Sequence, residues 1–538
     1  MKERPRTAFT LAALSLIAFG NVLSAQSGRA PLVVASKPFG ESYLLAEMFS
    51  QLLESRGIAV TRRPGLGATE VAFGALRTGA IDVYPEYTGT GLIAILRDSL
   101  SDSVARDPDA VFGHVSRRFR DLFGVRWLPP LGFENTYAIA VRKETSSRYS
   151  LRTLSDLARE SGHLDAGLTA DFIGRPDGLA GLSRAYGIRF KAVRSLSPAL
   201  KYQALAQGSV DVIDGYSTDG LLARYDLVTL DDDKSFFPPY QAAALVSARA
   251  DSLYPDAIAA LTLLSGRLDE RRMRQLNQRV EVDREDVALV AREALSDLGL
   301  IRGAASTKRA VTSRTGQSFA EYMVARRADI AEETLRHLLL SAAALIAAIL
   351  VAVPIGLALE RRRRLAEGTL GALGVVETIP SIALLASMLP LFGVGVAPAL
   401  VALWLYALYP IARATYTGVR EADRDAVEAA EALGTTPMQR LVWIRMPLAT
   451  PVIMAGVRTA AVITVGAATL AAFIGAGGLG EPIVQGLALA DTRLVLSGAI
   501  PAALLAILVD RALAVAERAL RPAHLRKHKV KRLEDRLG

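Results

Sequence analysis

Cysteine is absent from this chain of 538 residues, and histidine occurs only five times. The lack of cysteine excludes disulfide bonds, thiolate metal sites, cysteine nucleophiles and a lipidated N-terminal cysteine. The histidines form no HExxH or other closely spaced metal-binding set, and no GxSxG nucleophile elbow occurs. The chain also lacks the GxxxxGK(S/T) loop that holds phosphates in P-loop ATPases. We therefore predict a protein that is not an enzyme and that binds no metal or cofactor itself.

Two regions of different composition divide the chain. Residues 30–303 mix charged and apolar residues as soluble α/β proteins do, whereas residues 335–520 are rich in Ala, Leu, Val, Ile and Gly. The second region raises the mean hydropathy to +0.27. Because the length also exceeds that of one compact domain, we expect at least two structural units.

The N-terminus has the pattern of an export signal. Three basic residues among the first six precede an apolar run at 9–19, which small residues follow. We interpret residues 1–25 as a signal peptide cleaved after Ala25, or as an anchor. The anchor is the alternative because Leu23 is large for its distance from the cleavage position.

Five apolar segments after residue 330 are each long enough to cross a bilayer. They lie at 335–359, 369–392, 397–415, 449–475 and 494–516. The net charge of +9 is concentrated in basic runs beside these segments, at 361–364 and in the tail 521–538. Such runs are typical of cytoplasmic loops rather than of nucleic-acid binding, and no nucleic-acid partner is expected. The pattern predicts a multi-pass protein of the inner (cytoplasmic) membrane, with residues 30–303 on the extracytoplasmic side.

An internal repeat marks the soluble region. The elements Ala75-Leu76, Gly79, Asp82-Val83 and Tyr87 recur at identical spacing as Ala204-Leu205, Gly208, Asp211-Val212 and Tyr216. Each copy predicts a helix, a tight glycine turn, and a strand that ends in tyrosine. Ligands bind at the strand ends of open α/β sheets, so the tyrosines would face a shared cleft. The alternative is that each tyrosine lies in the core of an ordinary βα unit.

Several motifs follow one another along residues 31–300. They are Ala35-Ser36-Lys37, PEYTGT at 85–90, GFENTYAIAV at 132–141, DFIGRPDG at 171–178, DGYSTDG at 214–220 and FFPPYQAA at 236–243. Together they resemble the periplasmic binding proteins for glycine betaine, choline and related osmoprotectants. The resemblance implies an α/β two-lobed fold, with lobe one at 31–133 plus 240–303 and lobe two at 134–239.

The same resemblance implies a ligand site made of tyrosines and polar residues. The tyrosines would form a box around a trimethylammonium group, and they are Tyr87, Tyr137, Tyr216 and Tyr240. Aromatic faces suit this group, because a quaternary nitrogen has no N–H to donate. Lys37, Thr90 and Arg175 would hold a carboxylate, with Arg175 suited to a bidentate fork. Asn135 is a further candidate, and capping of a loop is its alternative role.

The polar stretch between the third and fourth apolar segments reads EAAEALGTTPMQRLVWIRMP at 428–447. It resembles the EAA loop by which ABC import permeases contact their ATPase, although Met446 stands where leucine is usual. The matching residues are Glu428, Ala429, Ala430, Gly434, Ile444 and Pro447. A short helix ended by Gly434 and a second helix would form a rigid docking knob. The alternative is an amphipathic surface helix without a partner.

A glycine-rich segment, FIGAGGLGEPI, places Gly475, Gly477 and Gly480 in a GxGxxG pattern. Dinucleotide sites need a preceding strand and a βαβ unit, whereas this segment follows an apolar span. We interpret it as an extracytoplasmic turn of the permease.

These resemblances predict a substrate-binding domain at 30–303, a linker at 304–318 and an ABC permease domain at 319–520. The function expected is ATP-driven import of quaternary-ammonium compounds such as glycine betaine, choline or carnitine. A separate ATPase subunit would use the ATP, and two copies of the chain would form the pathway. An importer of another betaine such as ergothioneine is the alternative within this class. A ligand-sensing membrane receptor is the rival from another class, and it would need one or two spans and a cytoplasmic signalling domain.

Overall fold

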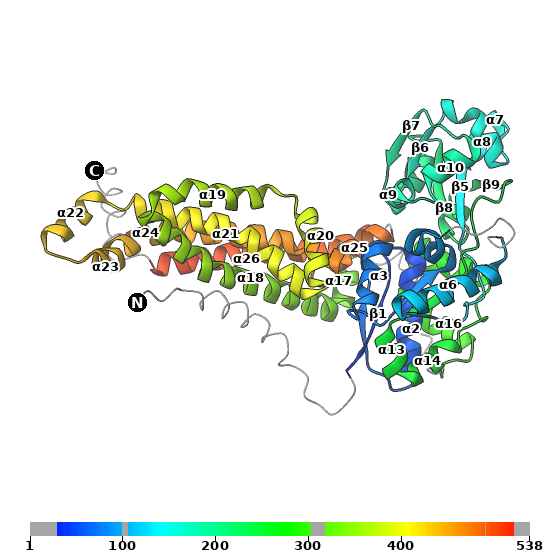
Figure 1. Ribbon diagram of the computed structural model, residues 1–538, viewed down its shortest axis with the longest axis horizontal. Helices are drawn as coiled ribbons and strands as arrows, with labels where there is room; N and C mark the ends of the chain where they lie inside the picture. The colour runs from blue at the N-terminus through cyan, green and yellow to red at the C-terminus, as the bar shows by residue number, and fades with distance from the viewer. Residues whose placement is uncertain (1–29, 99–105, 303–317, 490, 521–538) are drawn as a thin grey trace.

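The computed structural model describes residues 30–98, 106–302, 318–489 and 491–520. Figure 1 shows two α/β lobes at one end of an elongated molecule and a bundle of long helices extending from them. The expected signal peptide, almost all of the linker and the basic tail lie outside the described residues.

The first sheet has five strands in the order β2-β1-β3-β10-β4. They are β1 (Leu32–Ala35), β2 (Val60–Arg63), β3 (Val83–Tyr87), β4 (Arg126–Trp127) and β10 (Ala242–Val246). β1 is parallel to β2 and β3, whereas β10 is antiparallel to β3 and β4. We call this sheet and its helices lobe one.

The second sheet repeats this plan in the order β7-β6-β8-β5-β9. Its strands are β5 (Tyr137–Arg142), β6 (Asp165–Leu168), β7 (Ala192–Ser195), β8 (Val212–Tyr216) and β9 (Leu227–Leu230). β6 is parallel to β7 and β8, and β5 is antiparallel to β8 and β9. We call it, with its helices, lobe two. The chain passes from the first sheet to the second after β4 and returns before β10, and a bridge between Glu134 and Gln241 joins the two crossings.

The internal repeat corresponds to equivalent parts of the two sheets. A helix precedes each strand, α3 (Thr69–Arg77) before β3 and α11 (Pro198–Ala206) before β8. Gly79 and Gly208 form the turns with φ of 73° and 74°, a left-handed conformation that glycine adopts without steric cost. β3 and β8 occupy the central position of their sheets, so the two tyrosines that end them hold equivalent places.

The remaining helices of the lobes surround the sheets. They include α2 (Gly40–Ser55), α6 (Pro108–Phe123), α9 (Ala170–Gly174), α10 (Leu179–Tyr186), α12 (Gly220–Arg224), α14 (Pro255–Thr262), α15 (Glu270–Glu281) and α16 (Val287–Asp297). α2 packs against α14, α15 and α16 as well as the sheet. Its apolar residues are fully buried, and so is Glu41 in its first turn, which identifies α2 as a central helix of lobe one.

The helical region is built from long apolar helices. They and their connections are α17 (Phe319–Ala325), α18 (Arg327–Arg361), α19 (Arg363–Thr378), α20 (Ser381–Phe392), α21 (Val396–Arg420), α22 (Arg424–Ala432), α23 (Pro437–Gln439), α24 (Met446–Ala468), α25 (Gly480–Ala488) and α26 (Thr492–Leu520). Among the described residues, four helices are long and apolar enough to cross a membrane, at 327–361, 396–420, 437–468 and 492–520.

The expected span at 369–392 is not one straight helix. It consists of α19 and α20, which bend by 98° between Thr378 and Ser381, and the count of five holds if the pair forms one span. Ile379 has an extended backbone (φ −65°, ψ 128°), because the ring of Pro380 disfavours a helical conformation in the preceding residue. The apolar composition predicts one straight span at 369–392, and the Ile379–Pro380 step breaks it into two helices.

Candidate functional site

The four predicted tyrosines lie together between the two sheets. The ring centroids of Tyr137 and Tyr216 are 5.2 Å apart and stacked, and Tyr240 meets Tyr137 edge-on at 5.8 Å. Phe39, which was not predicted from the sequence, lies between Tyr87 and the other three tyrosines. Its ring centroid is 6.2 Å from that of Tyr87 and 6.0 Å from that of Tyr216. The shared-cleft interpretation of the repeat therefore agrees with the geometry, since Tyr87 and Tyr216 flank the same ring.

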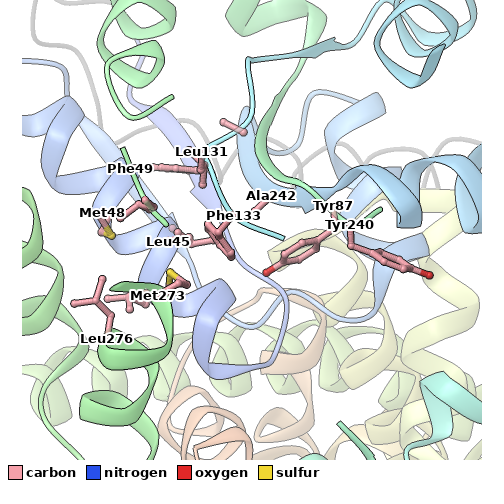
Figure 2. Close-up of a cluster of buried hydrophobic side chains, with 14 of the residues drawn as sticks. Leu45, Met48, Phe49, Tyr87, Leu131, Phe133, Tyr240, Ala242, Met273 and Leu276 are labelled. Carbon is pink, nitrogen blue, oxygen red and sulfur yellow. The ribbon is translucent and has the colours of Figure 1, made fainter. Parts of the chain in front are cut away.

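Strand register explains why distant residues meet here. Tyr137 and Tyr216 are directly opposite on the antiparallel strands β5 and β8, which places their side chains on the same face. Tyr240 precedes β10, the strand that pairs with β3. A Cβ on Gly89 would lie 2.6 Å from the Tyr240 ring, so the glycine of the PEYTGT motif lets this ring approach. In Figure 2 Tyr87 and Tyr240 lie together at one side of the buried apolar cluster of lobe one, next to Phe133 and Ala242, and their rings point in different directions.

Arg175 is buried beside the tyrosine rings, but its guanidinium group is already hydrogen-bonded to the carboxylate of Asp177. Its Nε donates to Oδ1 of Asp177 at 2.8 Å and its Nη2 donates to Oδ2 at 2.5 Å. Nη2 is also 3.5 Å from Thr90 Oγ1, and the guanidinium carbon is 5.8 Å from the Tyr137 ring centroid. Asp177 further accepts from the Tyr240 hydroxyl at 2.5 Å. A ligand carboxylate would therefore compete with Asp177 for Arg175.

Lys37 is likewise paired inside the protein. Its Nζ is 2.6 Å from Oε1 of Glu86, and both side chains are buried. The ammonium also lies 5.2 Å from the Tyr87 ring centroid and 5.7 Å from that of Phe39. Lys37 thus borders the aromatic cluster, with its charge balanced by a carboxylate that sequence reasoning did not select.

Glu41 is the main polar residue of the site that sequence reasoning missed. It is buried, and its Oε1 accepts from the Tyr87 hydroxyl at 2.6 Å and from Asn135 Nδ2 at 2.8 Å. Its Oε2 accepts from Thr218 Oγ1 at 2.6 Å and from Asn277 Nδ2 at 2.8 Å. Burial raises the pKa of Glu41, and the four donated hydrogen bonds oppose the rise. At the edge of the tyrosine cluster, the Glu41 carboxylate therefore connects three parts of the chain. They are lobe one, through Tyr87 and Asn277, lobe two, through Thr218, and the segment that crosses between the lobes, through Asn135.

Asn135 also has a free acceptor. While its Nδ2 donates to Glu41, its Oδ1 is buried and accepts no hydrogen bond from the described residues. A buried acceptor without a partner is costly, so a ligand hydroxyl or N–H within reach would gain from meeting it. The contact with Glu41 agrees with a place at the site rather than with a loop cap alone.

A groove of about 750 Å³ runs along the cluster. Glu134, Thr136, Ser217 and Phe237 border it, and of the four tyrosines only Tyr137 lines it. Non-bonded carbon atoms approach one another to about 3.5–4.0 Å, so a trimethylammonium group between two facing rings needs a separation of at least about 7 Å, and none fits between rings whose centroids are 5.2 Å apart. Entry of such a group therefore requires Tyr137 and Tyr216 to separate, or places the group at their edges.

The loop at 424–447 lies at the opposite end of the molecule from the lobes (Figure 1). α22 ends before Gly434, whose φ of 78° provides the turn, and Thr436 caps α23. A Cβ on Gly434 would meet nothing within 4 Å among the described residues, so within this chain the left-handed backbone is the feature that favours glycine here. Ala430 is buried, Ile444 and Pro447 are half-buried, and Glu428 and Ala429 are exposed. Leu433, Met438 and Trp443 are also exposed, at 84%, 60% and 62%, which makes this surface unusually apolar for a polar loop.

Comparison with known families divides the chain in the same way as the structure. Residues 30–297 match the substrate binding domain of ABC-type glycine betaine transport systems, and residues 325–522 match the inner membrane component of binding-protein-dependent transport systems. The choline transport system permease protein OpuBB of Bacillus subtilis is 42% identical over 209 residues, covering 39% of this chain and 96% of that protein. The chain belongs to the glycine betaine, carnitine and choline ABC transporter family. It is a fusion of a binding domain and a multi-pass permease of that family.

Two further relatives each match about half of the chain. The carnitine transport binding protein OpuCC of Listeria monocytogenes is 33% identical over 266 residues, covering 49% of this chain and 85% of that protein. The ergothioneine transport permease/ergothioneine binding protein EgtU of Helicobacter pylori is 36% identical over 271 residues. That alignment covers 50% of this chain and 48% of EgtU, so about half of each chain is matched.

Proposed function

We propose that this ABC importer takes up quaternary-ammonium compounds and binds their trimethylammonium group among Tyr87, Tyr137, Tyr216 and Tyr240. The observation that carries the proposal is the convergence of these four rings, from both sheets, on one cluster. A quaternary nitrogen offers no N–H, so hydrogen bonds cannot select it. A desolvated aromatic face attracts it by about 0.5–2 kcal/mol per ring.

The carboxylate of a betaine would lie at the Arg175 end of the cluster. Thr90 borders that end, and the guanidinium already lies against Tyr137. Lys37 lies beside Tyr87 and Phe39, so its ammonium would reach the carboxylate only of a ligand that extends to those rings. For Arg175 to bind the carboxylate of the ligand, at least one of its two hydrogen bonds to Asp177 must break. Choline has no carboxylate and would leave the Arg175–Asp177 pair in place.

Ergothioneine is a second candidate substrate, supported by the name of the Helicobacter pylori relative. Its trimethylammonium would suit the same rings, and Oδ1 of Asn135 offers an acceptor for a further ligand donor. Calorimetric titration of the full chain in lipid nanodiscs with glycine betaine, carnitine, choline and ergothioneine distinguishes the candidates. Binding of none of them would contradict the proposed substrate class.

The loop at 428–447 would dock a separate ATPase, and a second copy of the chain would complete the pathway. The exposed apolar side chains at 433, 438 and 443 support a protein partner at this end. The lobes would lie on the extracytoplasmic side, because the basic run at 361–364 follows the end of α18 that lies away from them. A sensory receptor is disfavoured, since a permease family covers residues 325–522.

Coupling can be tested separately from binding. Gly434→Asp forces a side chain into a left-handed conformation on the proposed docking surface, so we expect uptake by the chain reconstituted with its ATPase to fall at least tenfold. Glycine betaine affinity should stay unchanged, because the loop lies at the far end of the molecule from the tyrosines. Uptake by Gly434→Asp equal to that of the unaltered chain at matched expression would exclude this loop as the coupling element.

A further inference from the structure

The two lobes also meet where α12 of lobe two packs against α15 of lobe one. Two glycines allow a close approach at this contact. A Cβ on Gly220 would lie 2.7 Å from the Cα of Gln278 in α15, and one on Gly40 would lie 2.4 Å from Oε1 of Glu281. The N–H of Gly220 donates to Oε2 of Glu281 at 3.2 Å. The carboxylate that ends α15 therefore lies between the start of α2 in lobe one and the start of α12 in lobe two.

Asp219, the residue before Gly220, brings a second carboxylate to this contact. Its Oδ2 accepts hydrogen bonds from the Tyr202 hydroxyl and from the N–H of Tyr216, the latter at 3.0 Å. Asp219 also lines the groove that runs along the tyrosine cluster. The contact between α12 and α15 is thus connected to the proposed ligand site.

Charges of the same sign lie around Glu281. Burial raises the pKa of Glu281 well above its ordinary value, and the charges of Asp219 and Glu41 add to the rise. The backbone hydrogen bond and the ammonium of Lys201 oppose it, but Lys201 already pairs with Asp214 at 3.3 Å. Burial also raises the pKa of Asp219. The contact therefore favours a proton on one of its carboxyl groups.

Separation of the lobes would change the surroundings of Glu281. Water would replace Gly220 and Asp219 beside it, and its pKa would return toward the ordinary value of a carboxyl group. At a pH between these two values, the joined lobes bind more protons than the separated lobes. Joining is therefore favoured at low pH, and it weakens as the pH rises through the raised pKa of the joined state.

We propose that Glu281 and Asp219 form a proton-dependent latch between the lobes, which holds them together when the pair carries a proton and loosens when it does not. The inference rests on the proposed function in one respect, since lobes that close on a betaine would take up a proton as they bind it. Substrate capture would then be tighter in an acidic medium than in an alkaline one.

Amide hydrogen exchange of the full chain in lipid nanodiscs, without ligand, tests the latch itself. Protection is measured in peptides covering 216–222 and 278–283, relative to unstructured peptides at the same pH. We expect it to fall about fivefold or more between about pH 5.5 and about pH 8. Glu281→Gln keeps an acceptor for the Gly220 N–H but carries no charge, so its protection should stay high at both pH values.

Two further variants complete this experiment. Glu285→Gln is the matched control, because Glu285 is the next glutamate along the chain and pairs with Arg279 within lobe one at 2.5 Å. It should keep the pH dependence of the unaltered chain. Asp219→Asn removes the neighbouring charge and should weaken that dependence. The latch would be overturned by protection independent of pH in the unaltered chain, by an undiminished pH dependence in Glu281→Gln, or by low protection of Glu281→Gln at both pH values.

Calorimetry with glycine betaine then tests the link to substrate binding. Titrations in two buffers of different ionisation enthalpy measure the protons taken up on binding, and we expect uptake by the unaltered chain that Glu281→Gln lacks. The affinity of the unaltered chain should fall about tenfold between about pH 5.5 and about pH 8, and that of Glu281→Gln should stay constant. Binding without proton uptake would overturn the link. Absence of binding at both pH values would count against the substrate class, while the exchange data would still decide the latch.

Discussion

The two lobes build their halves of the tyrosine cluster from the same parts but hold them differently. In lobe one, the Lys37–Glu86 pair at 2.6 Å lies next to Tyr87, whose ring centroid is 5.2 Å from Nζ. In lobe two, the Lys201–Asp214 pair at 3.3 Å lies next to Tyr216, whose ring centroid is 5.6 Å from Nζ. Each lobe thus places a tyrosine beside a buried lysine–carboxylate pair.

The difference lies in the tyrosine hydroxyls. The hydroxyl of Tyr87 is fixed by Glu41, whereas Tyr216 is held through ring stacking on Tyr137 and through its backbone N–H, which donates to Asp219. We infer that lobe one supplies a preorganised ring and that lobe two supplies rings able to part around a ligand. Because the stacked pair at 5.2 Å leaves no room for a cation, the movement is expected on the lobe two side.

Loss of Glu41 should have the largest effect on stability. Glu41→Ala removes the shared acceptor of Tyr87, Asn135, Thr218 and Asn277, and buried donors without partners are costly. We expect the free energy of unfolding of the binding domain to fall by about 3 kcal/mol, measured by urea unfolding of the full chain. Glu47→Ala on the same helix is the control and should cost less than about 1 kcal/mol, since Glu47 pairs with the partly exposed Arg62. A similar fall in the free energy of unfolding in both variants would contradict the special role of Glu41.

Arg175→Ala should separate substrates by their carboxylate. We expect the affinity for glycine betaine to fall by about 2 kcal/mol and that for choline much less, because only the former offers a partner for the guanidinium. Calorimetric titration with both ligands provides the contrast. Equal losses would mean that the Arg175–Asp177 pair supports the fold or the closure of the lobes instead.

Removal of single hydroxyls should sharpen the difference between the lobes. From the sequence alone, phenylalanine would be tolerated at every position of the box, because the aromatic face remains. The structure changes this expectation for Tyr87, since Tyr87→Phe deprives Glu41 of a donor and should cost about 1 kcal/mol of betaine affinity or stability. Tyr216→Phe should cost little by comparison. Equal effects in calorimetry and urea unfolding would contradict the view that only lobe one fixes its ring through a hydroxyl.

Much of this architecture could be predicted from the sequence, because the relevant signals are local. The Gly434 turn, the equivalent turns at Gly79 and Gly208, and the apolar segments follow from residues adjacent in the chain. The break between α19 and α20 also has a local cause, the proline at position 380. It was not predicted, because the apolar composition on both sides of the proline is that of one continuous span.

The carboxylates of the site were harder to predict. The roles of Glu41, Glu86 and Asp177 depend on hydrogen-bond partners that the fold brings close to them. For example, Asn277, a partner of Glu41, is 236 positions away in the sequence. One available signal was an acidic residue in the first turn of a helix that is otherwise largely apolar. A buried carboxylate is expected to be paired, so Glu41 could have been marked for a role once α2 was recognised as central.

The most direct test of the account is an alanine series at Tyr87, Tyr137, Tyr216 and Tyr240 in the full chain, titrated with glycine betaine by calorimetry. The account predicts that each variant weakens binding by roughly 1–2 kcal/mol, because each removes one aromatic face from the trimethylammonium group. Undiminished binding in three of the four variants would contradict the aromatic site.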